Sequence, residues 1–257
     1  MEFDETFLHD LEVYRQSAFA RAKRQRYLTL LNPQPGEQIL DLGCGSGEFC
    51  RALLPYVAPT GQITGLDNSP GAIQLAIKLA GEEGRQNLTF EHGDGHDLTY
   101  EPERFDAAVC ISVLPFCTDP IRVLRELLRV LVKGGRLLAV NGDEDTRIYN
   151  CHDRQLGRRI LRAMADRACD PWVGRRLCYL VRQAGFTIVE KQVLADVEEE
   201  FKPGNAGYTL AHSMKKQLLS IGISAHEYHT WLADLQSCAE DGSYSYSVTT
   251  FVCLAEA

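Results

Sequence analysis

The sequence predicts an α/β protein in which helices cover both faces of a mostly parallel sheet. Between residues 36 and 145, short apolar runs alternate with segments whose apolar residues recur at helical spacing. Each short run is apolar almost throughout, which is typical of parallel strands buried on both faces. Glycine, proline and aspartate separate the runs, as expected for loops that connect strands to helices.

The elements of the first half can be placed in chain order. A helix is expected over 6–31, because its apolar residues recur at helical steps until the Asn32–Gly36 stretch breaks the pattern. A later helix, 119–135, opens with Asp119 before Pro120 and closes at two glycines. The remaining helices are expected at 47–57 and 69–84, and the strands at 38–43, 62–67, 88–94, 105–114 and 136–143.

After residue 145 the regular alternation of strands and helices ends, and most of the expected elements are helices. The last segment, 244–256, alternates β-branched and aromatic residues and follows a turn at Asp241–Gly242, so it could run antiparallel beside the other strands. Helices are expected at 153–167, 172–184, 208–220 and 225–239, and a strand at 186–194. With no linker or repeat, we expect one domain over 1–257, made of an N-terminal helical segment (1–35), a cofactor-binding core (36–145) and a C-terminal part (146–257).

Composition narrows the compartment and the partners. The formal net charge of −8 disfavours a nucleic-acid partner, and the basic stretch 15–26 is interpreted as a solvated helix face. Nine cysteines without zinc spacing favour a reducing compartment and no metal. No apolar run is long enough to cross a bilayer, and the acidic start is unlike a secretory signal, so we expect a cytoplasmic protein without a membrane partner.

The stretch "ILDLGCGSGEF", residues 39–49, indicates a ligand site. Its glycines, Gly43, Gly45 and Gly47, come where a strand meets a helix and permit both a tight turn and close approach to the main chain. The spacing is GxGxG, whereas dinucleotide sites use GxGxxG. Asp41 would also repel a pyrophosphate, so a cationic or zwitterionic ligand is favoured.

Acids at the next two strand ends indicate a nucleoside. Asp67 ends the second strand at about the distance from Gly43 at which an acid accepts hydrogen bonds from ribose hydroxyls. Asp94, between two glycines after the third strand, can accept from an exocyclic amine. Because the carboxyl ends of parallel strands meet at one edge, we expect Asp41, Asp67 and Asp94 to converge there.

Together these segments resemble class I S-adenosylmethionine-dependent methyltransferases. "ILDLGCGSGEF", "GLDNS", "GDGHDL", "FDAAVCISVL" and "LLRVLVKGGRLLAV" are similar, in order, to that family's motifs, and the C-terminal part is more weakly similar to bacterial small-molecule members. The resemblance implies a Rossmann-like seven-stranded sheet whose last strand is antiparallel, with S-adenosyl-L-methionine as cofactor and S-adenosyl-L-homocysteine as product. The cofactor-binding residues that we assign are Asp41, Gly43, Cys44, Gly45, Gly47, Asp67, Asn68, Asp94, Gly95, Cys110 and Ile111.

The resemblance also assigns parts of the cofactor to these residues. The three glycines would flank the methionine, Asp67 would bind the ribose, and Asn68 would lie beside the adenine. Asp94 and the Gly95 amide would read the adenine edge, and main chain near Cys110 and Ile111 would meet the amino group. Pro115–Phe116 stands where relatives often carry histidines, so a base from that position is absent.

Methyl transfer needs an aligned, dry site and, for a hydroxyl acceptor, a base. We assign His212 and Tyr14 as the catalytic candidates. The other histidines and tyrosines weighed, each more often a surface, capping or packing residue, are His92, His96, His152, His226, His229 and Tyr208.

A helical lid over the sheet edge is expected to enclose the acceptor. The apolar residues of these helices are Phe7, Leu11, Phe19, Trp172, Tyr179, Leu218, Tyr228 and Trp231, and most of them are expected only to cover the sheet. The predicted function is methyl transfer to oxygen, nitrogen or carbon of a small, partly apolar molecule, with homodimer formation left open. The alternatives are a cofactor-binding protein of this fold without turnover, a methyltransferase acting on a macromolecule, and a dinucleotide-dependent oxidoreductase.

Overall fold

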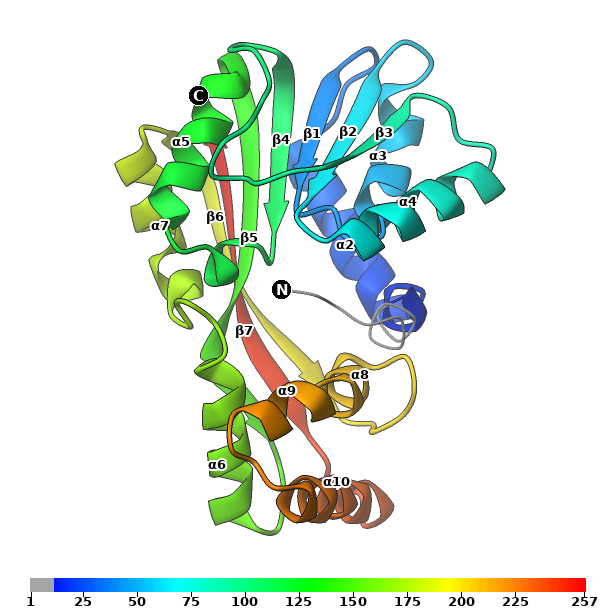
Figure 1. Ribbon diagram of the computed structural model, residues 1–257, viewed down its shortest axis with the longest axis vertical. Coiled ribbons are helices and arrows are strands. Elements are labelled where there is room, and N and C mark those ends of the chain that lie inside the picture. The colour runs from blue at the N-terminus through cyan, green and yellow to red at the C-terminus, as the bar shows by residue number, and fades with distance from the viewer. Residues whose placement is uncertain (1–11) are drawn as a thin grey trace.

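Residues 12–257 are described by a computed structural model, and they form a seven-stranded sheet in the order β3-β2-β1-β4-β5-β7-β6 (Figure 1). Strands β1 to β5 pair in parallel, and β7 runs antiparallel to both of its neighbours, which confirms the predicted fold class. The strands are β1 (Gln38–Leu42), β2 (Gln62–Asp67), β3 (Leu88–His92), β4 (Phe105–Ile111), β5 (Leu131–Tyr149), β6 (Thr187–Glu198) and β7 (Tyr246–Glu256).

Helices cover both faces of this sheet. On one face, α2 (Ala18–Leu31) and α3 (Glu48–Val57) pack into a core with β1, β2 and β4, to which α4 (Pro70–Glu82) contributes Ile73. On the other face, α5 (Pro120–Val130) and α7 (Val173–Ala184) pack against each other and against β5. Each face therefore has its own continuous apolar core, as a buried parallel sheet requires.

Strands β5, β6 and β7 extend past the carboxyl end of β4 and carry four further helices, which we call the helical cap (Figure 1). The cap consists of α6 (Arg154–Ala165), α8 (Ala206–Ser213), α9 (Lys215–Ser220) and α10 (Ala225–Glu240). Its core is built around Trp231, which is fully buried. The Trp231 ring lies edge-on to the Tyr149 ring of β5, with the ring centroids 5.3 Å apart. The cap is thus joined to the sheet by strands as well as by packing.

Several predicted helix bounds are wrong, each for a local reason. The expected helix 6–31 is interrupted at residues 16–17, and α2 starts only after Ser17, whose Oγ accepts the Ala20 N–H at 3.1 Å. Residues 6–11 of that prediction lie outside the described residues. The helix expected to reach 135 ends at Val130, because Leu131 is already extended and pairs with Phe105.

The predicted bounds of the second half are also too short or too simple. The helix expected over 208–220 is two helices, α8 and α9, that meet at Met214. Strand β5 runs on to Tyr149 through an irregular stretch between Asp143 and Ile148, and β6 runs on to Glu198. Long polar strands of this kind lack the continuous apolar run that marked the earlier strands.

Three of the apolar residues considered for the acceptor roof lie instead in the core of the cap. Trp172 and Tyr179 are exposed, at 48% and 57% of their area. Leu218, Tyr228 and Trp231 are buried in the core of the cap itself. Phe7 and Leu11 lie outside the described residues. Among residues 12–257, no helix has the length and apolar character needed to cross a membrane.

Candidate functional site: the glycine loop and its surroundings

The glycine loop, residues 43–47, follows β1 at the point where the strand order reverses. Its strand neighbours are β2 on one side and β4 on the other, and ligands of open parallel sheets bind at such a switch point. Gly43, Gly45 and Gly47 have φ values of +74°, +55° and +74°, a region that side chains strongly disfavour. Three left-handed residues in five turn the chain abruptly into α3.

Two of these glycines are required by the protein's own packing. A Cβ on Gly43 would lie 2.1 Å from Cγ2 of Val113, and a Cβ on Gly47 would lie 2.5 Å from Cε1 of Phe90. The three atoms nearest to a Cβ on Gly45 all belong to the Arg15 guanidinium, the first at 3.1 Å. At Gly45, the nearest neighbour is therefore the end of a long side chain and not the apolar core.

Asp67 ties the end of β2 to the glycine loop. Its Oδ2 accepts the Gly45 N–H and its Oδ1 accepts the Ser69 N–H, both at 2.9 Å. A carboxylate can accept further hydrogen bonds at each oxygen, so Asp67 stays able to bind hydroxyl groups. Asn68 is exposed beside it, and its carbonyl lies 3.2 Å from Nε2 of His92.

Asp94 is held at the end of β3 by His96. Its Oδ1 accepts the His96 N–H at 2.9 Å and lies 2.7 Å from the ring Nδ1. These hydrogen bonds hold the pKa of Asp94 below its usual value, so the carboxylate remains ionised. Gly95 packs closely on Leu42, from which a Cβ would lie 3.1 Å away.

Asp41 is a buried carboxyl in β1, beneath the glycine loop. Only 2% of its area is exposed, and the thiol of Cys50 donates to its Oδ2 at 3.2 Å. Burial raises its pKa to about 6, although the nearby charge of Arg15 partly opposes the rise. Cys44 and Cys110 are buried and Ile111 is half-buried.

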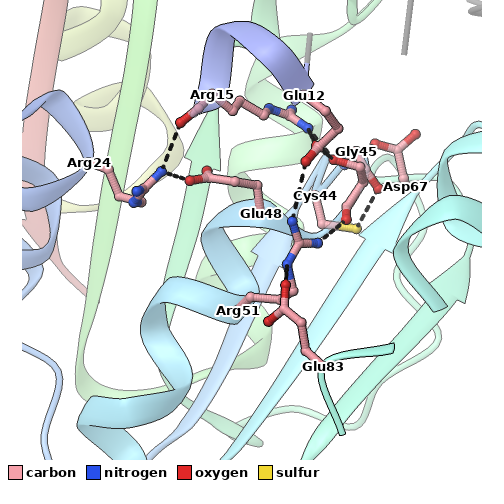
Figure 2. Close-up of polar contacts among 10 residues, drawn as sticks. Glu12, Arg15, Arg24, Cys44, Gly45, Glu48, Arg51, Asp67 and Glu83 are labelled. Atoms are coloured by element: carbon pink, nitrogen blue, oxygen red, sulfur yellow. Dashed lines mark hydrogen bonds and ion pairs between the residues drawn. The ribbon is translucent and has the colours of Figure 1, made fainter. Parts of the chain in front are cut away.

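The helical turn of residues 12–15, which we call the N-terminal turn, lies on the glycine loop (Figure 2). Arg15 donates to the hydroxyl of Ser46, and that hydroxyl donates to Glu12. Glu12 and Arg15 also pair with each other at 3.0 Å. The loop is thus covered by two oppositely charged side chains rather than by apolar residues.

Arg51 connects the N-terminal turn, the loop and two helices. From α3, it donates to the Ser46 carbonyl at 2.6 Å, and it pairs with Glu12 at 3.4 Å and with Glu83, after α4, at 3.1 Å (Figure 2). Arg24 of α2 similarly pairs with Glu48 at the start of α3. These ion pairs fix the entry of α3 and therefore the shape of the loop.

The interpretation of 15–26 as a solvated face is therefore wrong for most of its charges. Besides Arg15 and Arg24, Lys23 pairs with Asp196 of β6, and Arg26 donates to Gln192 at 2.7 Å. The signal in the sequence was the density of five basic residues in twelve positions, of which Arg15, Lys23 and Arg24 pair with acids. Their pairing depends on long-range contacts that no local spacing reveals.

We expect Arg51→Met to lower the free energy of unfolding by about 1–3 kcal/mol and to weaken cofactor binding, because the Ser46 carbonyl and Glu12 lose a buried cationic partner. Urea unfolding and calorimetry with S-adenosylhomocysteine measure the two effects. Arg85→Met is the matched control, since Arg85 pairs with the same Glu83, at 3.0 Å, on the exposed surface. Equal effects of the two variants would contradict the positioning role of Arg51.

A second polar group, which we call the tyrosine cluster, lies where β5 and β7 extend toward the cap. Tyr246 of β7 lies opposite Tyr149 of β5, with ring centroids 4.8 Å apart, and accepts from the Arg147 guanidinium. Tyr14 of the N-terminal turn is close enough to Tyr246 and Glu198 for their charges, after the larger effect of burial, to raise the pKa of its phenol. Tyr14 therefore lies near Tyr246 and Glu198, and the adjacent Arg15 contacts the glycine loop.

The two catalytic predictions are placed differently. Tyr14 joins the tyrosine cluster, but a phenol with a raised pKa remains protonated, which suits a hydrogen-bond donor better than a base. His212 lies in α8, stacks on Tyr208 at 3.9 Å and approaches the Tyr208 carbonyl through Nδ1 at 2.9 Å. Both assignments stay predictions. His152, His226 and His229 are exposed on the cap.

The residues around the loop fit the nucleoside cofactor that the sequence implies. Within residues 12–257, the hydrogen-bond partner of the buried Asp41 carboxyl is the Cys50 thiol and not a cationic group. Asp67 and the ionised Asp94 follow at the next two strand ends. This donor set complements an ammonium group, ribose hydroxyls and an exocyclic amine.

Comparison with known proteins agrees with this geometry. The family model described as a methyltransferase domain matches residues 33–168. A demethylmenaquinone methyltransferase of Lactococcus lactis subsp. lactis is 32% identical over 133 residues, and the match spans 52% of each chain, about half of that relative. The uncharacterized 37.1 kDa protein of transposon TN4556 from Streptomyces fradiae is 29% identical over 239 residues, which are 93% of this chain and 68% of the relative.

Solved structures share the fold at lower identity. A provisionally named methyltransferase from Bacillus halodurans C-125 superposes with a TM-score of 0.65 at 16% identity, over 91% of this chain and 98% of that one. Identity this low supports the fold alone, whereas the family model covers more than half of the sequence. The chain belongs to the methyltransferase domain family and has the fold of class I S-adenosylmethionine-dependent methyltransferases.

Proposed function

We propose that the protein transfers a methyl group from S-adenosylmethionine to a small, partly apolar acceptor. The observation that carries the proposal is the buried Asp41 beneath the glycine loop, followed by Asp67 and Asp94 at the next two strand ends. The similarity to a protein named for demethylmenaquinone supports a small-molecule acceptor. The formal net charge of −8 argues against a nucleic-acid acceptor.

Each charged group of the site has a role in holding the cofactor. Asp41 would accept from the ammonium group, and Arg15, freed from Ser46, would bind the carboxylate of the same amino acid. Asp67 would accept from the ribose hydroxyls. Asp94, oriented by His96, would accept from the adenine amine while the Gly95 N–H meets the ring. When bound, the cofactor supplies an electrophilic methyl group on a sulfonium.

The acceptor is proposed to bind between the glycine loop and the tyrosine cluster. Tyr14 and Arg15 are consecutive in the N-terminal turn. Tyr14 lies near Tyr246, and Arg15 donates to Ser46 of the glycine loop, so this turn connects the two regions. Tyrosine rings supply apolar area, and the Tyr14 hydroxyl would donate a hydrogen bond to an oxygen of the acceptor. Excluding water there would favour loss of the sulfonium charge as methyl moves.

The test of this function uses the full chain with isotope-labelled S-adenosylmethionine and fractionated small-molecule extracts. We expect formation of S-adenosylhomocysteine together with an acceptor whose mass increases by one methyl group. The Tyr14→Phe variant should raise KM for the acceptor more than it changes cofactor affinity. Binding of the cofactor without any labelled product across extracts would favour a binding protein without turnover.

Cofactor affinity should depend on pH through Asp41. Its pKa of about 6 in the free protein would fall when an ammonium group binds beside it, so binding releases a proton. Affinity should therefore be steady above about pH 7 and weaken below it, by about tenfold between pH 7 and pH 5. Calorimetry with S-adenosylhomocysteine measures this dependence. In Asp41→Asn, the affinity should no longer change between pH 7 and pH 5. A pH dependence that persists in this variant would assign the titration to another group.

A further inference from the structure

The helical cap contains a cluster of three different metal-ligating groups that the proposed methyl transfer does not use. His152, just before α6, meets Asp234 and Cys238 of α10, and their ligand atoms all lie within 4.8 Å of one another. In the part of the chain that the structure describes, this is the one group of three or more such residues with this closeness. Asp234 and Cys238 are four positions apart, so they lie on one face of their helix.

The three ligand atoms lie close together, but Sγ and Oδ1 must both move for one ion to bind between them. Zinc binds nitrogen, oxygen and sulfur at about 2.0–2.3 Å, so neighbouring ligand atoms are separated by roughly 3.5 Å. Cys238 Sγ lies 3.6 Å from Nδ1 and 3.9 Å from Nε2 of His152, so it lies over the imidazole ring, and its side chain must turn toward the Nδ1 lone pair to share an ion. The same Nδ1 lies 2.7 Å from Oδ1 of Asp234, so these two atoms need to separate by less than about 1 Å to admit an ion.

The other ring nitrogen of His152 is already placed as zinc sites require. Its Nε2 lies 3.0 Å from Oδ2 of Asp241, on the side of the imidazole away from the shared Nδ1. A histidine that ligates zinc usually donates its second N–H to a carboxylate, which fixes the ring and makes it a better ligand. Asp241 therefore acts as the orienting group and not as a fourth ligand.

Burial and charge favour a cation here. Cys238 is fully buried, whereas the His152 side chain is 53% exposed, so an ion can reach the thiol from solvent past the imidazole. Asp234 and Asp241 supply two carboxylates against one imidazole. Nitrogen, sulfur and oxygen in one set favour Zn²⁺ over Mg²⁺ or Ca²⁺, which prefer oxygen alone.

We propose that His152, Asp234 and Cys238 bind a zinc ion that fastens α6 to α10, with water at the fourth position. No zinc spacing is visible in the sequence, because His152 and Asp234 are 82 positions apart and meet only through packing of the cap. Asp234 also accepts the N–H groups of His152 and Asp153, at 3.1 and 2.9 Å, so it already joins the two helices without metal. The ion would strengthen that junction and would take no part in methyl transfer.

The proposal is tested on the full chain after chelator treatment, by titration with Co²⁺ as a spectroscopic substitute and then with Zn²⁺. We expect one equivalent of Co²⁺ with a thiolate-to-cobalt absorption band, its displacement by Zn²⁺, and a rise in melting temperature of about 5 °C at saturating zinc. His152→Gln and Cys238→Ser should each weaken binding at least tenfold. Cys169→Ser and His226→Gln, which change exposed residues outside the cluster, are the matched controls.

Absence of the thiolate band, or a band that survives in Cys238→Ser, would overturn the proposal. If Cys238→Ser does not fold, His152→Gln decides the result, because that side chain is half exposed and its replacement leaves the cap core unchanged. Affinity for S-adenosylhomocysteine should be the same in His152→Gln and in the unaltered protein. The zinc proposal and the proposed function therefore fail or hold separately.

Discussion

Replacing Gly43 by alanine is expected to lower the free energy of unfolding by about 2–5 kcal/mol and to abolish measurable cofactor binding. The left-handed φ of +74° costs a side chain about 1–2 kcal/mol. The new methyl group would also overlap Cγ2 of Val113, 2.1 Å away, and overpacking of a filled core costs about 1–3 kcal/mol more. Urea unfolding and calorimetry with S-adenosylhomocysteine measure the two losses.

Gly134→Ala separates the two causes. Gly134 has a φ of +76°, but a Cβ there would find no atom within 4 Å, so only the backbone cost of about 1–2 kcal/mol should appear. Adding Val113→Ala to the Gly43→Ala variant should restore part of the stability by removing the overlap. If Gly43→Ala and Gly134→Ala prove equally destabilising, the contact with Val113 does not constrain the loop.

Replacing Asp67 by alanine is expected to weaken cofactor binding by about 1–3 kcal/mol, roughly 5- to 150-fold in the dissociation constant. The substitution removes the carboxylate that would accept hydrogen bonds from the ribose hydroxyls. The N–H groups of Gly45 and Ser69, each 2.9 Å from this carboxylate, would also lose their acceptor, and the loop would become less rigid. Calorimetric titration with S-adenosylhomocysteine gives the affinity directly.

Asp106→Ala is the matched control for this loss. Asp106 likewise accepts a backbone N–H, from Gln38 at 2.8 Å, but it does so where β1 begins, at the edge of the sheet opposite the glycine loop. The control should lose some stability and keep the cofactor affinity. An Asp67→Ala variant that binds S-adenosylhomocysteine as tightly as the unaltered protein would show that the ribose assignment is wrong.

The sheet was predictable from the sequence because its strands are short, apolar and separated by turn residues. The run at 38–43 and the aspartate–proline opening at Asp119 each identified an element whose structure depends on local chemistry. The long extension of β5 could not be predicted, because residues 143–149 are mostly polar and are held as a strand by pairing with β7. The same holds for α8 and α9, whose separation at Met214 carries no proline or glycine signal.

The site was predictable only where a motif fixed it. Three glycines and three aspartates stand at strand ends, so their meeting follows from the parallel sheet alone. Glu12, Arg15 and Arg51 were missed, because long charged side chains can reach many partners and only the tertiary fold selects one. Tyr149 and Tyr246 were missed likewise, because they come from two strands that are far apart in the sequence, although Tyr14 was named.

The continuous strands β5, β6 and β7 decide which part of the molecule can open. Because they run from the sheet into the cap, the cap cannot swing away without breaking their pairing. The N-terminal turn, by contrast, is fastened to the glycine loop by the side chains of Glu12 and Arg15. Bound molecules should therefore exchange when the N-terminal turn detaches from the glycine loop. Dissolved salt screens the ion pairs of Glu12 and Arg15, so it should accelerate this exchange.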